Sequence, residues 1–309
     1  MVAGGARVIV VTGATDRGKS TFCRFLAGQF LESGQAAAYL DADTGQKDVG
    51  PPASLTLRFL DPGREPSEGA DGFYFMGSVT PRGHLLPVAI GSRILLDRAR
   101  DRAVIVNTDG MIHGSGRILR HYQLEALAPD HVVALERDSE RGIVPAPLGC
   151  RIHRLRPSPA ARRRNPERRR GARQEAFREY FRKARRVVLG LARLRMERCL
   201  LFTGEPVDPQ GFLHAEDTPE GRLVVGNRPL PDGEIKRIPA GFERELLCGV
   251  VEPGGRCLGL GRLEALDFRR RSLSLWTPVP EGRIAGLQLG DLYVDGTGRE
   301  LSRSRPRYL

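Results

Sequence analysis

The feature that most constrains this chain is the stretch GATDRGKST, residues 13–21, which directly follows the apolar run RVIVV. It matches the pattern G-x-x-x-x-G-K-[ST] of a phosphate-binding loop, in which a buried strand turns into a helix. The glycines let successive N–H groups and the start of the helix point at an anion. We therefore expect nucleotide phosphates to bind at Gly13, Thr15, Asp16, Arg17, Gly18, Lys19, Ser20 and Thr21.

Two side chains of this loop have expected roles of their own. In phosphate-binding loops the lysine bridges the β- and γ-phosphates, and the following hydroxyl is a ligand of Mg²⁺. These roles fall on Lys19 and Ser20. The loop thus predicts binding of ATP with Mg²⁺, but not yet what the nucleotide is used for.

The pattern of apolar segments predicts an α/β fold. Residues 7–11, 36–43, 102–110 and 130–136 have the composition of buried strands, and residues 117–127 that of a helix. The segment after Gly18 has helical spacing, and Gly34 is suited to end that helix. Strands that alternate with helices predict a parallel sheet covered on both faces.

Acidic side chains follow two of the expected strands. Asp41, Asp43 and Gln46 come at the end of the second strand, and Asp109 ends the third. If the second strand neighbours the first, Asp43 lies near the γ-phosphate, where a carboxylate can take a hydroxyl proton or hold a metal. Asp41 and Asp43 would share one strand face. The alternative is that these acids only build turns, and for Asp109 the two roles are equally open.

Charge is concentrated in one part of the chain. The net charge is +12, and residues 151–195 contain sixteen Arg and one Lys against three Glu. The rest of the chain is close to neutral, so this segment indicates a polyanionic partner such as nucleic acid. A solvated charged helix is the alternative.

Proline and helix signals organise this basic segment. Residues 145–166 contain five prolines and few apolar residues, which indicates a mobile loop. A long helix should follow, with Asn165 as N-cap and Pro166 at its first position. Its packing face is expected to consist of Ala172, Phe177, Phe181, Val188 and Leu191.

The sequence pattern changes after Arg198, where short apolar runs alternate with Gly and Pro in an all-β pattern. We therefore expect a P-loop domain over residues 1–198, including an arginine-rich lid at about 151–195, and a β-rich domain over residues 199–309. The five cysteines form no C-x-x-C pair, and His84, His113 and His121 match no metal-site spacing. With no apolar run of membrane-spanning length, we expect a cytoplasmic protein without a membrane partner.

Several of these stretches together resemble one family, the polynucleotide 5′-hydroxyl kinases that phosphorylate RNA ends. The resemblance rests on GATDRGKST (13–21), LDADTGQKDVGPPASLTL (40–57), FMGSVTPRGH (75–84) and IVNTDGMIHGSG (105–116), in the family's order. RNPERRRGARQEAFREYF (164–181) resembles the family's lid and the helix after it. The match spans about residues 7–190 and looks like a minimal form without the N-terminal β domain of the eukaryotic members.

The resemblance implies a role for each matching position. The triphosphate and Mg²⁺ would be held by Lys19, Ser20 and Thr21, with Asp43 and Asp109 as further candidate metal ligands. Asp43 would be the general base, and Lys19, Arg164 and Arg169 would act on the transferred phosphoryl group. Thr80 and Pro81 would belong to a clasp over the nucleotide, and Gln46, Met111 and Arg168 would contact the nucleic acid. Met111 stands where the family has a tryptophan, so it lacks an aromatic face for stacking.

The resemblance implies that the chain transfers the γ-phosphate of ATP to the 5′-OH end of RNA, with DNA as a further acceptor. Two alternatives stay open at this point. The chain could be an ATP-binding scaffold of a nucleic-acid processing complex with little kinase activity, or a kinase for a small acceptor such as a nucleoside. The density of arginine argues against the small acceptor, which needs few phosphate contacts.

Overall fold

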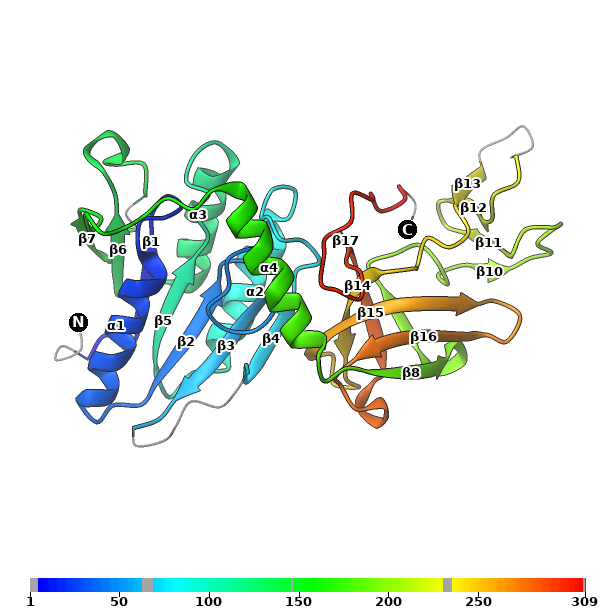
Figure 1. Cartoon of the computed structure of the whole chain (residues 1–309), viewed down its shortest axis with the longest axis horizontal. Helices are drawn as coiled ribbons and strands as arrows, with labels where there is room; N and C mark the ends of the chain where they lie inside the picture. Colours follow the sequence, from blue (N-terminus) through cyan, green and yellow to red (C-terminus); the bar gives the residue numbers. More distant parts are fainter. Residues whose placement is uncertain (1–4, 63–68, 146, 230–234, 308) are drawn as a thin grey trace. The chain divides into compact units, whose positions relative to one another are not determined.

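The structure is a computed structural model that describes residues 5–62, 69–145, 147–229, 235–307 and 309 (Figure 1). It divides into two compact units, Met1–Ala176 and Phe177–Leu309. The change of unit thus precedes the predicted boundary at residue 198, because the strand at Arg185–Gly190 pairs within the C-terminal unit.

A sheet in the order β7-β6-β1-β5-β2-β3-β4 forms the centre of the N-terminal unit. The first five of these strands are parallel, and β3 and β4 are added antiparallel. The strands are β1 (Val8–Thr12), β2 (Ala37–Ala42), β3 (Ser54–Leu60), β4 (Gly72–Phe75), β5 (Ala103–Thr108), β6 (His131–Leu135) and β7 (Arg151–Leu155). The helices are α1 (Lys19–Glu32), α2 (Leu85–Asp97), α3 (Ser115–Leu127) and α4 (Pro166–Phe181), and η1 (Asp138–Glu140) is a 3₁₀ turn.

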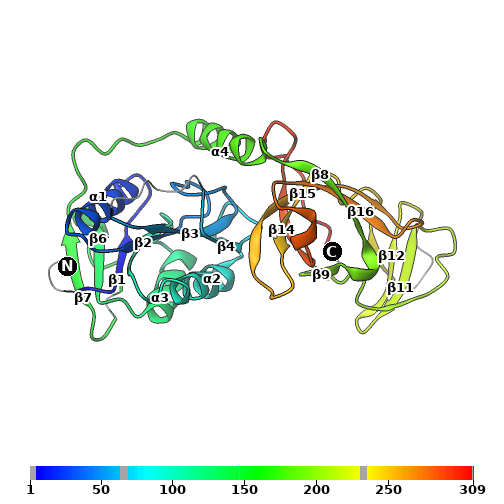
Figure 2. The ribbon, with the colours of Figure 1, turned by 90° about the horizontal axis from the view of Figure 1, so that it is seen from below.

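Alternation along the central strands explains how both faces are covered. In β1, Val8 and Val10 belong to a core shared with residues of α2 and α3, whereas Ile9 and Val11 pack with residues of α1. Successive strand side chains point to opposite faces, so one apolar strand contributes to both cores. Figure 2 shows α1 on one face of the sheet and α2 and α3 on the other. The predicted parallel α/β sheet is confirmed.

Two details of the predicted arrangement are wrong, and one condition is not met. The second strand neighbouring the first is the condition for Asp43 to lie near the γ-phosphate, but β5 lies between β1 and β2. The proline-rich stretch 145–166 is not all loop, since β7 pairs with β6 inside it. The helix after Pro166 ends at Phe181, and β8 follows at Arg185–Gly190. Val188 is exposed in β8 between buried neighbours, because strand residues alternate where the prediction assumed a helical period.

The C-terminal unit is β-rich, as the short apolar runs between Gly and Pro predict. One sheet runs β8-β16-β15-β14-β17-β9, and a smaller sheet runs β10-β11-β12-β13. Their strands are β8 (Arg185–Gly190), β9 (Arg195–Glu197), β10 (Glu205–Pro206), β11 (His214–Thr218), β12 (Gly221–Val225), β13 (Ile235–Ile238), β14 (Leu246–Val251), β15 (Cys257–Asp267), β16 (Ser272–Thr277) and β17 (Gly286–Tyr293); the 3₁₀ turns are η2 (Leu191–Arg193) and η3 (Glu281–Arg283). Among the described residues no helix combines the length and the hydropathy that crossing a membrane requires.

Candidate active site

The phosphate-binding loop joins β1 to α1, and its two glycines have conformations that suit glycine. Gly13 has φ 145°, and a side chain there would lie 2.2 Å from the carbonyl oxygen of Leu135 at the end of β6. Gly18 has φ 87° and directly precedes α1. Side chains are disfavoured in such backbone conformations, so the loop can wrap an anion only with glycine at these positions.

Lys19 and Ser20 begin α1 at the base of this loop. The Lys19 ammonium is largely buried and donates to the carbonyl oxygen of Ala14 at 3.0 Å. Burial lowers the pKa of Lys19, while the negative charges of Asp43 and Asp109 act in the opposite direction. The amide of Asn107 in β5 donates to the Ser20 hydroxyl at 3.3 Å. A buried cation and a fixed hydroxyl therefore face the place where the loop would hold phosphates.

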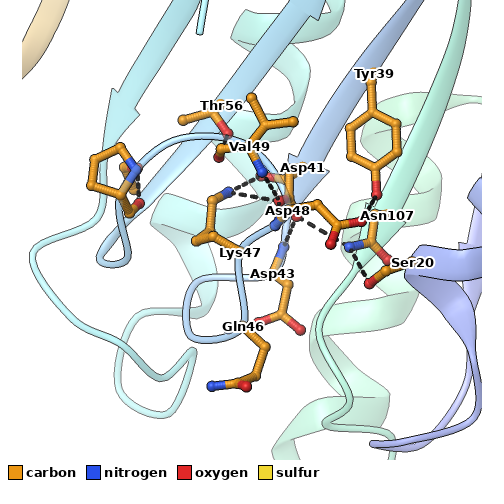
Figure 3. Close-up of polar contacts among 12 residues, drawn as sticks. Ser20, Tyr39, Asp41, Asp43, Gln46, Lys47, Asp48, Val49, Thr56 and Asn107 are labelled. Carbon is orange, nitrogen blue, oxygen red and sulfur yellow. Dashed lines mark hydrogen bonds and ion pairs between the residues drawn. The ribbon is translucent and has the colours of Figure 1, made fainter. Parts of the chain in front are cut away.

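Asp41, at the end of β2, organises the loop that follows it (Figure 3). One carboxylate oxygen accepts from the backbone N–H groups of Asp48 at 2.7 Å and Val49 at 3.1 Å. The other accepts from the N–H of Asp43 and the amide of Asn107, each at 3.2 Å. The Lys47 ammonium lies 3.5 Å from the carboxylate, and both side chains are buried. Asp41 is therefore a structural residue that fixes the loop.

Asp43 is placed at the beginning of that loop with its carboxylate away from the Asp41 network (Figure 3). Its Oδ1 accepts from the N–H groups of Gly45 and Gln46, each at 2.9 Å. Burial raises the pKa of Asp43 to about 6, against the opposing effect of the Lys19 charge. A carboxylate with this pKa is a competent proton acceptor near neutral pH.

Asp109, after β5, is engaged within the protein. Its Oδ1 accepts from the N–H of Met111 at 2.7 Å, and its Oδ2 pairs with the buried guanidinium of Arg120 at 3.0 Å. Of the two roles left open by the sequence, the turn is present in the structure. Arg120 also donates to Gln123, whose amide in turn donates to Ser92 at 2.8 Å, so the network links α3 to α2.

The segment before α4 lies against the phosphate-binding loop. The Asp16 carboxylate accepts from the backbone N–H of Arg164 at 2.9 Å and pairs with the Arg169 guanidinium at 2.5 Å. Asn165 caps α4 by accepting from the N–H of Arg168 at 2.8 Å, which confirms the predicted N-cap. The Gln46 amide donates to the carbonyl oxygen of Arg169 at 3.3 Å. The basic segment is thus attached to both loops of the site.

A cavity of about 510 Å³ opens between these elements of the N-terminal unit. Lys19, Ser20 and Asp43 line it together with lid residues such as Arg164 and Arg168. Further basic side chains in its wall are Arg17, Arg24, Lys47, Arg162, Arg163 and Arg173. The acids in the wall are Asp16, Asp43 and Asp48, so positive charge predominates. A cavity with this lining suits a polyphosphate and an anionic acceptor.

Arg17 contributes to this wall but is already paired. Its guanidinium donates to both carboxylate oxygens of Glu140 in η1, one of them at 3.0 Å from Nε. The pair is largely buried, and the hydrogen bond raises the pKa of Arg17 and lowers that of Glu140. Arg17 therefore ties the phosphate-binding loop to η1, which follows β6.

Several predicted site residues lie outside the cavity wall. Among the described residues Gly13, Thr80, Pro81, Asp109, Met111 and Arg169 are not in its lining. The clasp segment is nevertheless close, because a side chain on Gly45 would lie 2.8 Å from the carbonyl oxygen of Val79. Met111 packs against the core beneath α2 and α3. The roles assigned to these residues from the sequence stay predictions.

Sequence reasoning missed three residues that build the site: Lys47, Asn107 and Glu140. Lys47 neutralises the buried Asp41, and Asn107 joins Asp41 to Ser20. Asn107 stands in a strand whose other residues are mostly apolar, VIVNT, which is a usable signal for a buried polar contact. Glu140 carries no such signal, because its partner Arg17 is far away in the sequence.

A phosphate-binding loop at the start of a parallel sheet, facing a carboxylate and a basic lid, defines a P-loop protein of the phosphotransferase type. Residues 13–183 match the family model described as "mRNA cleavage and polyadenylation factor CLP1 P-loop". The chain belongs to this family.

Curated relatives match along most of the chain. A polyribonucleotide 5′-hydroxyl-kinase of Methanocaldococcus jannaschii is 30% identical over 95% of this chain and 88% of its own length. A kinase of the same name from Pyrococcus abyssi is 28% identical over 95% of this chain and 89% of its own. The human polyribonucleotide 5′-hydroxyl-kinase Clp1 is 31% identical over 57% of this chain and 45% of its own.

The fold is also similar to a solved structure, that of Clp1p in a complex with a segment of Pcf11p. The TM-score is 0.63 at 15% identity, over 94% of this chain and 74% of that chain. This similarity extends across both compact units and supports the fold.

Proposed function

We propose that the chain is an ATP-dependent polyribonucleotide 5′-hydroxyl kinase, which transfers the γ-phosphate of ATP to the 5′-OH end of RNA. The observation that carries the proposal is that Lys19, Asp43 and two arginines of the lid, Arg164 and Arg168, line one cavity. The family match and the names of the archaeal relatives support it. An acceptor hydroxyl needs a base, and the transferred group needs positive charge around it.

Asp43 is assigned as the general base. In the reaction the acceptor 5′-oxygen forms a bond to the γ-phosphorus while the bond from phosphorus to the bridging oxygen of ADP breaks. The hydroxyl proton passes to the Asp43 carboxylate. The pKa of about 6 leaves this carboxylate ionised at neutral pH and still basic enough to accept a proton.

Lys19 and the lid arginines supply the positive charge. Negative charge spreads over the equatorial oxygens of the phosphoryl group during transfer, and cations held in a partly closed cavity stabilise it without reorganising. Arg164 and Arg168 line the cavity directly. Thr21 and the N–H groups of the loop complete the expected triphosphate site. The expected clasp residues Thr80 and Pro81 directly follow Val79, whose carbonyl oxygen lies close to Gly45 in the loop after β2.

The residues present fit a magnesium ion bound together with ATP. Ser20 holds its hydroxyl at the loop, and the described residues form no cluster of three or more metal-binding side chains. This donor set fits an ion held mainly by phosphate oxygens and water, with Ser20 as the protein ligand and Asp43 as a nearby acid. The ion would neutralise charge on the β- and γ-phosphates.

Gln46 is assigned to the RNA end. Its amide nitrogen donates to the carbonyl oxygen of Arg169 in the lid, whereas its amide oxygen is buried without a hydrogen-bond partner among the described residues. A buried unpaired acceptor beside the base is suited to receive a hydrogen bond from a sugar hydroxyl. Arg168 would hold the first phosphates of the RNA strand.

The proposal is tested with γ-labelled ATP and a 5′-OH oligoribonucleotide, with a nucleoside and a matched DNA oligomer as further acceptors. We expect label transfer to RNA, and its loss in Lys19→Ala and Asp43→Ala. Asp217→Asn is the matched control, because Asp217 pairs with Arg222 on the surface of the C-terminal unit. ATP binding without any labelled product would contradict the kinase assignment, and equal labelling of the nucleoside would contradict a polynucleotide acceptor.

A further inference from the structure

Asp16 connects two parts of the site that are far apart in the sequence. It lies in the phosphate-binding loop with φ 61°, a left-handed conformation that Asp tolerates better than most residues. Its side chain is 10% exposed. One oxygen, Oδ2, accepts from both the backbone N–H of Arg164 and the guanidinium of Arg169. Asp16 therefore contacts residues on either side of the Asn165 cap.

The first turn of α4 needs such an anion. Six arginines at positions 162–164 and 168–170 surround the cap, and the positive end of the helix dipole lies at the same place. Like charges so close together repel one another and favour separation of the segment from an already basic cavity. The Asp16 carboxylate offsets this repulsion, and the amide of Gln46 adds a second attachment at the carbonyl oxygen of Arg169.

The direction of the arginine side chains follows from this attachment. Arg164 and Arg168 line the nucleotide cavity, whereas Arg169 is not in its wall and pairs with Asp16. Arg168 and Arg169 follow one another in the first turn of α4, so their side chains leave the helix in different directions. The pair with Asp16 holds the Arg169 guanidinium outside the cavity wall and thereby sets the rotation of α4 about its axis. In that rotation the Arg168 side chain is directed into the cavity.

We propose that Asp16 is a positioning residue that holds the lid on the phosphate-binding loop through Arg169, so that Arg164 and Arg168 face the transferred phosphate. The inference rests on the proposed kinase function. It gives the Asp16–Arg169 pair a role distinct from triphosphate binding, and it assigns Arg169 to anchoring the lid. Because the effect on the reaction is indirect, it must disappear when the residues that Asp16 positions are absent.

The kinetic test uses Asp16→Asn, which keeps an oxygen acceptor for the Arg164 N–H but removes the charge that pairs with Arg169. We expect kcat to fall about 10- to 100-fold, as for the loss of one charge-assisted contact that positions a catalytic group. The KM for ATP should change little, because the backbone donors of the loop remain. Arg169→Gln and the double variant should show the same loss as Asp16→Asn, since the pair acts as a unit.

One variant background and one comparison between variants separate positioning from direct catalysis. In the Arg164→Ala/Arg168→Ala background, Asp16→Asn should have almost no further effect on kcat. If Arg169→Gln instead lowers kcat much more than Asp16→Asn, and the two losses multiply, then Arg169 acts on the phosphate itself and the inference is overturned. Asp217→Asn, which breaks the surface pair with Arg222, should behave like the wild type throughout.

A readout independent of kinase activity keeps this inference separate from the proposed function. Trypsin cleaves after arginine, and residues 162–164 are exposed. With its attachment weakened in Asp16→Asn, this segment should be cut several-fold faster than in the wild type, while urea unfolding stays the same. Equal cleavage rates would overturn the positioning role, whereas a wild type without kinase activity but with faster cleavage in the variant would overturn only the function.

Discussion

Replacing Asp43 with Asn should abolish phosphoryl transfer and, at the same time, stabilise the protein at neutral pH. Burial raises the pKa of this carboxyl from 3.8 to about 6, so the ionised form is unfavourable in the folded protein. At ~1.4 kcal/mol for each tenfold change, this corresponds to about 3 kcal/mol. The value is an upper limit, because Asp43 is partly exposed and because Lys19 loses an opposite charge in the variant.

The sign of the predicted change in stability follows from how the free energy of unfolding depends on pH. A carboxyl whose pKa is higher in the folded than in the unfolded state adds stability at low pH, and that stability is lost as pH rises through the folded pKa. The wild type therefore loses this stability between pH 3.8 and about pH 6. Asparagine does not titrate, and it can still accept from the N–H groups of Gly45 and Gln46. The advantage of the variant should grow by about 1–3 kcal/mol between about pH 4 and about pH 8.

The assay is urea unfolding of both proteins without nucleotide across this pH range, together with initial rates of label transfer. The wild-type rate should rise with pH through about 6, as Asp43 becomes ionised. Asp217→Asn is a control of opposite sign, because the hydrogen bond from Arg222 lowers the pKa of Asp217. If the difference in free energy of unfolding between wild type and Asp43→Asn is the same from acid to neutral pH, then burial does not disfavour the ionised carboxylate and the reasoning fails.

Three further predictions concern the loop after β2, the binding of ATP and the binding of RNA. Asp41→Asn should destabilise the protein by about 3–5 kcal/mol in urea unfolding, because it removes the carboxylate charge that pairs with the buried Lys47 ammonium; a loss below about 1 kcal/mol would contradict the role of Asp41 in fixing the loop. ATP at about 100 times its Kd should stabilise the wild type by about 2.7 kcal/mol. This gain should vanish in Gly13→Ala, where the new side chain meets the Leu135 carbonyl; retained stabilisation by ATP would refute that. The KM for RNA should rise at least about tenfold between about 50 and about 200 mM salt, and a flat salt profile would argue against phosphate contacts by the lid.

The sequence by itself determined the phosphate-binding loop and the class of fold. Gly13 and Gly18 are needed where the backbone wraps an anion, and Lys19 and Ser20 must follow them on the first turn of the helix. Continuous apolar runs fixed the buried strands, and Asn165 with Pro166 fixed the start of α4. These features depend on neighbours along the chain, so their physical causes are visible in the sequence.

Only the tertiary structure decided which strand ends lie together and how their side chains are paired. Strand order placed β5 between β1 and β2, and this brought Asn107 between Asp41 and Ser20. The pairs Asp16–Arg169 and Arg17–Glu140 join residues more than 120 positions apart, so no local pattern distinguishes them from solvated charges. The roles of Asp41 as organiser and Asp43 as candidate base differ for the same reason, since burial and partners, and not residue type, set the chemistry of each carboxylate.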